Sequence, residues 1–565
     1  MVLHRDVIRI PSNVDYQTLI VFCQVEGRSG AAYFDDLVLQ DGVPSTWKEG
    51  LGQTDPGTAL TGSIVVDASQ RQRRIPSTLF GTNIEWVWDG NGIWDSGKDT
   101  FNSDILSLAR DSAPTLLRYP GGTFSDYYDW TRGIGPRSSR QAISSMPGGA
   151  TSVPRFGTDE ALDFARTAGG QMMITVNIVT GTPQMAADWV RYVNKTGLAV
   201  QYWEIGNESY VPGNASSMSP EQYALTFINF ARAMRLADPR IKLMAIADEN
   251  FPYSIPRQYP DWTERVLRIA GTEIDCLSIH AGYAPAIGAD LGWPARTVYA
   301  SMLGAPSAVA DNLRRLSAKL TTLVPGRDIR IAMTEWGPYF QTDLTGRFLD
   351  HPKTIGAALY TASMLKTMIE SDRTDIGNFF KLVDPFSLGA IGQRDSLYRA
   401  NASQMVFSLV RKYLGQNLVL SQSQSPTFDS PAVGWVDAAA AVPFLESIAS
   451  VSDDGTRLSV LAINQHLDRS IKVQIRLQRF TPTGPVEVRT LKGSTPDSHT
   501  GSALPAITGL TWPKQAPVAP STSFPTASIS QIESVVSSVA ASASDVTLTL
   551  PPGSVSAIMI PGKTQ

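Results

Sequence analysis

Eight short apolar runs that alternate with segments of helical periodicity constrain the fold of this chain more than any other feature. The runs lie at residues 79–86, 115–119, 172–178, 200–205, 241–247, 276–280, 329–334 and 376–382. Charged residues recur at helical spacing between them, at 103–111, 158–168, 184–193, 219–237, 260–270, 306–322 and 353–370. Strands that alternate with helices build parallel sheets, and eight such units predict an α/β fold, a closed (β/α)8 TIM barrel over residues 75–414.

The chain after residue 415 predicts a different kind of structure. The helical period is lost there, and segments such as 458–464 and 471–477 alternate or are rich in β-branched residues. A strand, a Pro-Pro-Gly turn and a second strand fit residues 545–560. We therefore expect a C-terminal antiparallel β-sandwich over 415–565, interrupted by a long Ser-, Ala-, Pro- and Thr-rich loop at 493–544.

Composition excludes several classes of function. The 48 basic and 52 acidic residues give a net charge of −4 without a long basic run, so we expect no nucleic-acid and no membrane partner. The sequence contains no apolar stretch of about 18 residues, so no membrane-spanning helix is predicted. The two cysteines, Cys23 and Cys276, lie far apart, which excludes a disulfide framework and predicts two free thiols. Dinucleotide-binding, serine-hydrolase and zinc-protease motifs are absent.

Two glutamates follow apolar runs at positions where a barrel carries its chemistry. The fourth run leads into Asn207-Glu208 and the seventh into Glu335-Trp336. Because the reactive groups of such a barrel lie at the carboxyl ends of its strands, both carboxylates should meet at one rim. Cleavage of a glycosidic bond needs two carboxyl groups, one to protonate the leaving oxygen and one to attack carbon or activate water. Solvated surface glutamates are the alternative, but both residues lie among Trp and Gly.

Four segments carry a resemblance to a known family. They are Phe80-Gly-Thr-Asn-Ile-Glu85, Arg118-Tyr-Pro-Gly-Gly-Thr-Phe124 with Tyr128-Asp-Trp-Thr-Arg-Gly-Ile-Gly-Pro136, Tyr202-Trp-Glu-Ile-Gly-Asn-Glu208, and Thr334-Glu-Trp336. Over roughly residues 63–565 the chain resembles the clan A glycoside hydrolases, and most of all family 51, the α-L-arabinofuranosidases. The resemblance implies a retaining glycoside hydrolase that releases arabinofuranosyl residues from plant-type polysaccharide or oligosaccharides, with Glu208 as acid/base and Glu335 as nucleophile.

The resemblance also implies a set of substrate-binding residues: Glu85, Arg118, Asn207, His280, Tyr283 and Trp336. In this interpretation Arg118 keeps Glu335 ionised, and Asn207 binds the sugar 2-hydroxyl. Glu208 is expected to be protonated at rest, because it is partly buried and repelled by the charged Glu335. Since the two carboxyl groups supply the nucleophile and the proton, no cofactor and no metal are expected.

The chain departs from the family pattern near the glycone. Thr123 stands where the family has Asn, and one extra residue separates His280 from Tyr283. The linkage, and exo or endo action, stay open. An endo-acting glycanase on xylan or glucan and a non-catalytic carbohydrate-binding protein are the alternatives. The loops at 86–98 and 284–300 could wall off or line the cleft.

Several single residues also allow two interpretations. His280 could be a core histidine, and Trp86, Trp88 and Trp94 could line a cleft or fill the core. Asp248 and Glu249 could bind a metal, although helix capping and hydrogen bonding at the rim fit them better.

The N-terminal residues predict a short β segment ahead of the barrel. Residues 1–45 resemble the remnant of a β-sandwich carbohydrate-binding module, and 46–74 fit a linker followed by the first strand of the sandwich. No signal peptide is evident in this chain. The expected partner is an oligosaccharide or polysaccharide, the expected location is secreted or periplasmic, and the oligomeric state stays open.

Overall fold

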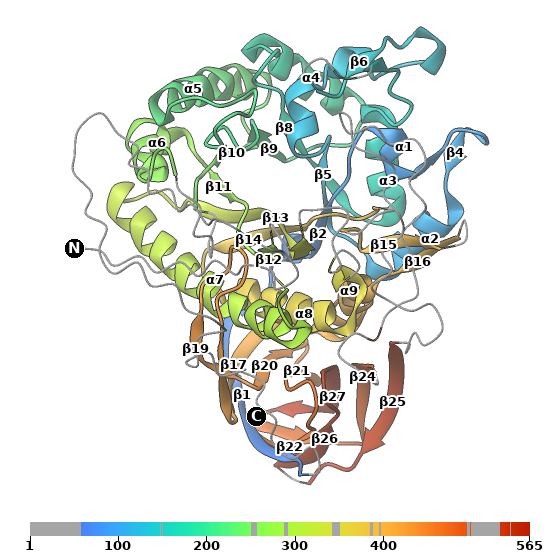
Figure 1. Cartoon of the computed structure of the whole chain (residues 1–565), viewed down its shortest axis with the longest axis vertical. Helices are drawn as coiled ribbons and strands as arrows, with labels where there is room; N and C mark the ends of the chain where they lie inside the picture. Colours follow the sequence, from blue (N-terminus) through green and yellow to red (C-terminus); the bar gives the residue numbers. More distant parts are fainter. Residues whose placement is uncertain are drawn as a thin grey trace, which may run out of the picture.

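The computed structural model describes residues 58–565 except for 147–148, 150, 250–256, 288–291, 342–347, 349–350, 385–387, 395–396, 494–497, 499–531 and 543. A barrel and a C-terminal sheet make up the described chain (Figure 1). The predicted β segment at 1–45, Cys23 and most of the predicted loop at 493–544 lie outside the described residues. Within that loop, residues 533–539 are described and form a strand, β25.

The barrel consists of eight parallel strands in the described part of the chain. They are β2 (Gly81–Asn83), β5 (Leu116–Tyr119), β8 (Gln171–Val176), β9 (Tyr202–Ile205), β10 (Lys242–Ile246), β11 (Cys276–Ile279), β13 (Arg330–Gln341) and β14 (Thr374–Phe379). They pair in the order β11-β10-β9-β8-β5-β2-β14-β13, and β13 pairs with β11 to close the ring. The predicted barrel is therefore confirmed. Its strands read as continuous apolar runs because helices cover the outside and side chains fill the inside.

The helices of the barrel are α2 (Ser103–Ser112), α3 (Thr158–Ala168), α4 (Pro183–Lys195), α5 (Pro220–Ala237), α6 (Trp262–Ala270), α7 (Ala295–Leu323), α8 (Ile355–Glu370) and α9 (Ala402–Tyr413). Their starts follow capping chemistry. The Asn102 side chain accepts two backbone N–H groups at the start of α2, and Ser219 and Gln222 form a capping box on α5. The helix α9 was not among the predicted helices.

Two predictions between the sixth and seventh barrel strands were wrong. The predicted helix at 306–322 starts too late, because α7 begins at Ala295 and runs through Pro306. Buried side chains such as Val298, Met302 and Leu303 anchor the N-terminal half and outweigh the lost hydrogen bond. The predicted loop at 284–300 contains the short strand β12 (Tyr283–Ile287), which pairs with the far end of β13.

The C-terminal sheet has ten strands among the described residues: β1 (Leu60–Arg74), β17 (Asn417–Gln424), β20 (Leu445–Val451), β21 (Arg457–Asn464), β22 (Ile471–Gln478), β23 (Phe480–Pro482), β24 (Val486–Lys492), β25 (Glu533–Val539), β26 (Asp545–Leu550) and β27 (Ser554–Thr564). The pairing is antiparallel, as predicted, except between β1 and β22. β1 precedes the barrel in sequence, so the whole barrel is inserted between the first strand of this sheet and the rest.

Smaller elements decorate the barrel and the sheet. The two-stranded ribbons pair β3 (Trp94–Asp95) with β4 (Thr100–Phe101), β6 (Ile143–Ser144) with β7 (Thr151–Ser152), β15 (Ile391–Arg394) with β16 (Leu397–Ala400), and β18 (Thr427–Ser430) with β19 (Ala439–Pro443). A short helix α1 (Trp88–Asn91) and the 3-10 turn η2 (Thr123–Tyr127) lie in loops at the carboxyl rim.

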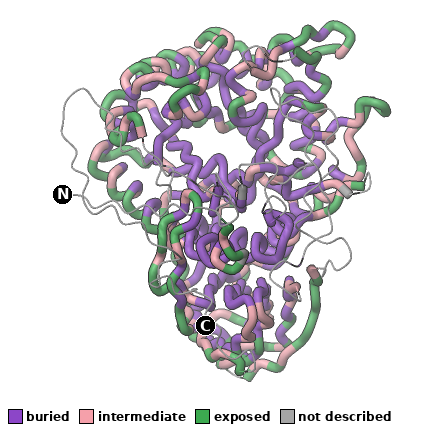
Figure 2. Tube along the Cα trace, in the orientation of Figure 1, coloured by how far each residue is buried: buried purple, intermediate pink, exposed green. Residues whose placement is uncertain are grey.

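The helices α8 and α9 join the two parts. α8 packs against β13 and β14 on one side and against β20, β21 and β27 on the other, and nearly all its residues are buried. A helix that is apolar on every face is expected where it is covered on every face. The buried trace accordingly continues from the barrel into the sheet (Figure 2). None of the described helices has the length and apolar character needed to cross a membrane.

Cys276 is a buried free thiol at the start of β11. Burial raises its pKa to about 12, so the sulfur stays protonated and acts as a small apolar side chain.

Candidate active site

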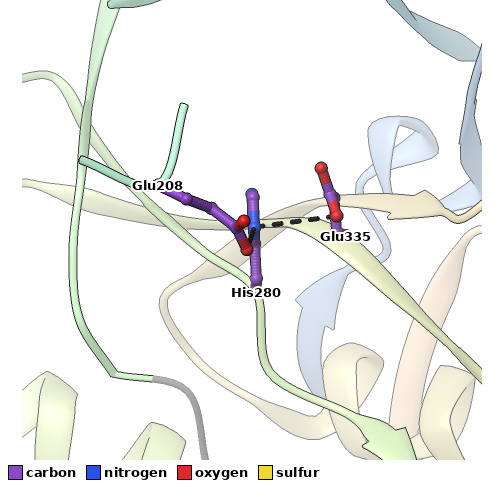
Figure 3. A group of neighbouring side chains, drawn as sticks. All are labelled: Glu208, His280 and Glu335. Atoms are coloured by element: carbon purple, nitrogen blue, oxygen red, sulfur yellow. Dashed lines mark hydrogen bonds and ion pairs between the residues drawn. The ribbon is translucent and has the colours of Figure 1, made fainter. Parts of the chain in front are cut away.

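The carboxyl rim of the barrel brings the two candidate catalytic glutamates together. Glu208 follows β9, His280 follows β11, and Glu335 lies in β13 where that strand passes beyond the barrel. His280 lies between the two carboxylates, which point toward it from opposite sides (Figure 3). One oxygen of each glutamate and Nδ1 of His280 all lie within 4.8 Å of one another. This spacing matches retaining glycosidases and is too short for the water that inverting enzymes place between carboxyls about 6.5–9.5 Å apart.

Arg118 in β5 is a fully buried centre of hydrogen bonding. Its guanidinium donates to Glu335 Oε1 at 2.7 Å and to Glu204 Oε2 at 2.7 Å. It also donates to the side-chain oxygens of Asn83 and Asn207, both at 2.9 Å. Burial lowers the pKa of Arg118, but the charges of Glu204 and Glu335 outweigh it and raise the pKa above its ordinary value. Arg118 is therefore a permanent cation held against the candidate nucleophile.

Glu204 is a second partner of Arg118 that the sequence analysis missed. It is fully buried in β9 and accepts from Thr175 Oγ1 at 2.7 Å and from Ser278 Oγ. Burial raises the pKa of Glu204, but Arg118 and these hydrogen bonds lower it by more. The signal was visible in Trp203-Glu-Ile205, where a charged residue interrupts a buried strand and so requires a buried partner.

His280 and Glu208 form a short contact with His280 Nδ1 2.7 Å from Glu208 Oε1. The same nitrogen lies 3.7 Å from Glu335 Oε2. Burial lowers the pKa of His280, but the charge of Glu335 and the contact with Glu208 raise it above its usual range. Burial raises the pKa of Glu208, but the His280 hydrogen bond and charge lower it overall. These opposite shifts favour a proton on His280 rather than on Glu208, where the sequence analysis expected it.

Tyr283 is a second hydrogen-bond donor to the Glu335 carboxylate. Its hydroxyl donates to Glu335 Oε2 at 2.7 Å, while Arg118 binds the other carboxylate oxygen. Tyr283 reaches this position from the start of β12 despite the extra residue after His280. Gly282 has a φ of +95°, and its carbonyl accepts the backbone N–H of Gly337 at 3.1 Å. The glycine thus absorbs the insertion in a left-handed conformation that other residues adopt at a cost.

Glu85, which follows β2, forms a further charged cluster with residues from distant parts of the chain. Its Oε2 atom accepts from Lys381 Nζ and from Asn91 Nδ2, both at 2.7 Å. Burial lowers the pKa of Lys381, but Glu85 and Asp384 raise it above its ordinary value, so Lys381 stays a cation. Sequence reasoning missed Lys381 and Asn91. They belong to no motif, and Lys381 lies 296 residues from Glu85 along the chain.

The loop after β5 leaves room beside the carboxylates. A Cβ atom added to Gly122 would lie 2.7 Å from Glu335 Oε1, so a side chain there would occupy the space in front of Glu335. Asn207 Oδ1 accepts from Arg118, whereas its buried Nδ2 atom has no hydrogen-bond partner among the described residues. A buried amide of this kind is a donor available to a ligand.

The predicted aromatic residues divide between core and rim. Trp336 is fully buried against Phe379 and Phe407, so it cannot touch a substrate and supports Glu335 by packing alone. Successive residues of a strand point to opposite faces, and Glu335 takes the inner one. Trp86 and Trp94 are likewise buried, while Trp88, at the start of α1 in a loop at the carboxyl rim, is 47% exposed.

Asp126 in η2 is a buried carboxyl group that sequence reasoning also missed. It has no exposed surface, and neither oxygen has a hydrogen-bond partner within the described chain. Burial raises its pKa to about 7; the Ser216 hydroxyl opposes this change, and the charge of Glu208 adds to it. Asp126 is therefore a carboxyl group at this rim whose pKa lies near neutral pH, and burial also raises the pKa of Asp248, to about 6.

Metal binding is poorly supported by the described residues. Asp248 pairs with Arg257 at 3.4 Å and Glu249 with Lys319 at 2.5 Å, so both carboxylates already face cations. Within the described ranges, Glu208, His280 and Glu335 are the group close enough to share an ion. The Arg118 guanidinium, 2.7 Å from Glu335, opposes a further cation there.

Comparison with known proteins gives a consistent result. Residues 108–264 match the family model described as the alpha-L-arabinofuranosidase 1 domain. The chain is 24% identical to an exo-α-(1→6)-L-arabinofuranosidase of Bifidobacterium longum, over 77% of this chain and 89% of that protein. It is also 24% identical to an intracellular exo-α-(1→5)-L-arabinofuranosidase of Halalkalibacterium halodurans, over 74% of this chain and 88% of the relative.

Solved structures share the whole architecture. The family 51 α-L-arabinofuranosidase of Thermotoga petrophila superposes with a TM-score of 0.73 at 22% identity, over 88% of this chain and 100% of that one. An α-L-arabinofuranosidase of Thermotoga maritima, solved with arabinose, gives a TM-score of 0.70 at 23% identity, over 89% and 100%. At these identities the likeness establishes the fold.

Proposed function

We propose, on the premise that this chain is a retaining glycoside hydrolase most like family 51, that it releases α-L-arabinofuranosyl residues from plant-type oligosaccharides or polysaccharides. The observation that carries the proposal is the pair of carboxylates within 4.8 Å, one of which is fixed at both oxygens by Arg118 and Tyr283. A carboxylate held in one orientation by a buried cation is suited to attack carbon rather than to take up a proton.

In the first step Glu335 attacks the anomeric carbon and the bond to the leaving oxygen breaks. The departing oxygen takes a proton from Glu208, and a covalent glycosyl-enzyme forms. In the second step Glu208, now a carboxylate, removes a proton from water, and the water oxygen displaces Glu335 from the anomeric carbon. Two inversions give an arabinose of retained configuration.

The position of the resting proton fits this cycle. The negative charge of Glu335 is the largest factor that raises the pKa of His280. That charge is lost as Glu335 bonds to the sugar, so the pKa of His280 falls while the leaving oxygen needs a proton. The 2.7 Å contact passes the proton from His280 Nδ1 to Glu208 and on to the leaving oxygen. When the product leaves and Glu335 regains its charge, His280 takes up a proton again.

The glycone would be held by groups on both sides of the carboxylates. The Glu85 carboxylate accepts sugar hydroxyls while Lys381 and Asn91 hold its Oε2 atom. The open Asn207 amide donates to the 2-hydroxyl, a contact that strengthens in the transition state. Thr123 and Lys381, which border this space, would set the sugar that the enzyme prefers.

The proposal also includes exo action and a secreted or periplasmic location. The curated relatives that act on (1→5) and (1→6) links are named exo-enzymes, and three of them are named intracellular. A polymeric substrate favours a secreted or periplasmic enzyme, which fractionation of the producing cells would test.

The test uses aryl glycosides and polymers in parallel. We expect turnover of 4-nitrophenyl α-L-arabinofuranoside well above that of the β-D-xylopyranoside and β-D-glucopyranoside. Proton NMR should find the retained anomer first, and branched arabinan should yield free arabinose. An inverted first product would refute the mechanism, whereas oligosaccharides from xylan or glucan would favour the endo-glycanase. The Glu335→Ala variant controls for contaminating activity.

A further inference from the structure

A cavity of about 690 Å³ lies at the end of the barrel opposite the candidate active site. It opens where the amino-terminal ends of β13 and β14 meet the end of β1 and the end of α9. Its charged lining residues are Arg73, Arg74, Arg330, Arg411, Asp372 and Asp375. Arg330 begins β13, and Glu335 lies beyond the point where that strand leaves the barrel, so the two sites are separate.

Two of the arginines share one carboxylate. Arg73 Nη2 lies 2.7 Å from Asp375 Oδ1, and Arg330 Nε lies 2.7 Å from Asp375 Oδ2. Burial lowers the pKa of Arg73, Asp375 raises it and the charge of Arg330 lowers it further, which leaves the pKa below its ordinary value. Arg330 also pairs with Asp328 at 3.1 Å, and Arg74 pairs with Asp453 at 2.7 Å, so three of the four lining arginines have a carboxylate partner.

Arg411 has no such partner. It lies in the last turn of α9, with its guanidinium 5.2 Å from the centre of the Phe80 ring. In the described part of the chain it makes no ion pair and no hydrogen bond, and its Nε atom is buried. Burial lowers the pKa of Arg411. A half-buried guanidinium with unused donors is costly unless a ligand accepts from it.

A purely structural role explains less. A basic residue at the carboxyl end of a helix complements the helix dipole, and the neighbouring Lys412 does so from an exposed position. The dipole does not account for the cavity that Arg411 lines. We propose that this cavity binds the phosphate group of a small phosphorylated molecule, with Arg411 as the main contact. The planar guanidinium matches phosphate oxygens, and the volume is typical of small-molecule sites.

The experiment measures binding to the full chain by calorimetry and by thermal unfolding. Inorganic phosphate is compared with chloride at equal ionic strength, and glucose 6-phosphate is the organic probe. We expect phosphate to bind and to raise the unfolding temperature, because a ligand specific for the folded state stabilises it. Arg411→Gln should bind at least about tenfold more weakly, because one charge-assisted contact is lost. Lys412→Gln removes the same charge from the same helix end outside the cavity and should bind like the unchanged chain.

The outcomes distinguish a phosphate-binding role of Arg411 from a purely structural one. Tighter binding of glucose 6-phosphate than of phosphate would support a phosphorylated organic ligand; equal binding would support an oxyanion site that takes the free ion. No binding beyond the chloride control, or equal binding by the unchanged chain and Arg411→Gln, would overturn the proposal. If Arg411→Gln does not fold, Arg411→Lys serves in its place, with weakened but measurable binding expected because the charge stays and the planar fork is lost. Hydrolysis of the aryl arabinofuranoside should be unchanged in these variants.

Discussion

His280 Nδ1 lies 2.7 Å from Glu208 Oε1, a hydrogen-bond distance at which the protonation of each residue depends on the other. The pKa of His280 is raised and that of Glu208 is lowered, so the alkaline limb of kcat/KM should report the loss of the shared proton above the usual histidine range. In His280→Asn the proton must reside on the carboxyl group itself. We therefore expect the alkaline limb to move to lower pH.

A pH–rate profile on the aryl arabinofuranoside measures this change. His466→Asn is the control, because His466 is a buried histidine of the C-terminal sheet, far from the rim. An alkaline limb that stays in place in His280→Asn would show that His280 does not hold the proton.

The two glutamates should differ in their response to azide. Glu335→Ala cannot form the covalent intermediate, so turnover should be lost on every substrate. Glu208→Ala should still form the intermediate from an activated aryl glycoside and then stall, because a good leaving group needs little acid. Azide should rescue Glu208→Ala and give a glycosyl azide of retained configuration, whereas Glu335→Ala should give the inverted azide.

NMR of the azide products decides between the assignments. Glu221→Ala, in the first turn of α5 where the half-buried carboxylate pairs with Arg265, should behave like the unchanged enzyme. The opposite stereochemistry would exchange the roles of Glu208 and Glu335.

Arg118 should tolerate no substitution, not even by another cation. Lysine keeps the charge but cannot donate in a fork to Glu204, Glu335 and Asn207 together. We expect Arg118→Lys to lower kcat/KM by about 10²–10³-fold, as for other lost transition-state contacts. Arg118→Gln leaves Glu204 buried without its cation and should lower the free energy of unfolding by about 3–5 kcal/mol. Arg191→Lys on the surface of α4 is the matched control, and near-normal activity of Arg118→Lys would contradict this role.

The sequence predicted the barrel and the placement of the two glutamates because both depend on local patterns. Each apolar run had the length of a strand, and the polar residue after it had to lie at the carboxyl rim. The short strand β12 and the N-terminal part of α7 were missed, because their stability comes from tertiary packing rather than from a local signal.

The remainder of the site depends on contacts between distant parts of the chain. Lys381 meets Glu85 only because β14 and β2 are neighbours in the closed barrel. Trp336 was predicted to bind substrate, but it is buried on the outer face of its strand. Strand alternation places the neighbour of an inward glutamate on that face. The opposite pKa shifts of His280 and Glu208 depend on the charge of Glu335 and on a 2.7 Å contact that no motif records.

Trp88 should act on long substrates rather than on the reaction itself. Its indole is 47% exposed at the mouth and is held edge-on by Phe124, with ring centroids 5.4 Å apart. A sugar beyond the cleaved bond can stack on such a ring, a contact worth about 1 kcal/mol. Trp88→Ala should raise KM for arabinan oligosaccharides about fivefold and leave the aryl arabinofuranoside nearly unchanged. Leu236→Ala, an exposed apolar residue on the outer face of α5, controls for surface effects, and equal changes on both substrates would argue against a stacking role.

Asp126 should make the fold less stable as the pH rises. Its pKa is about 7 in the folded chain against an ordinary 3.8, so between these values the folded state keeps a proton that the unfolded state has lost. Stability then falls with rising pH, by at most about 4 kcal/mol once the pH exceeds 7, since each pKa unit corresponds to about 1.4 kcal/mol. Asp126→Asn removes the titration and keeps the shape. Its unfolding temperature should match the unchanged chain near pH 4 and exceed it by several degrees at pH 8, whereas Asp163→Asn on the exposed face of α3 should follow the unchanged chain throughout. Scanning calorimetry at a fixed scan rate measures the difference, and parallel curves for Asp126→Asn and the unchanged chain between pH 4 and 8 would show that Asp126 is ionised in the folded protein.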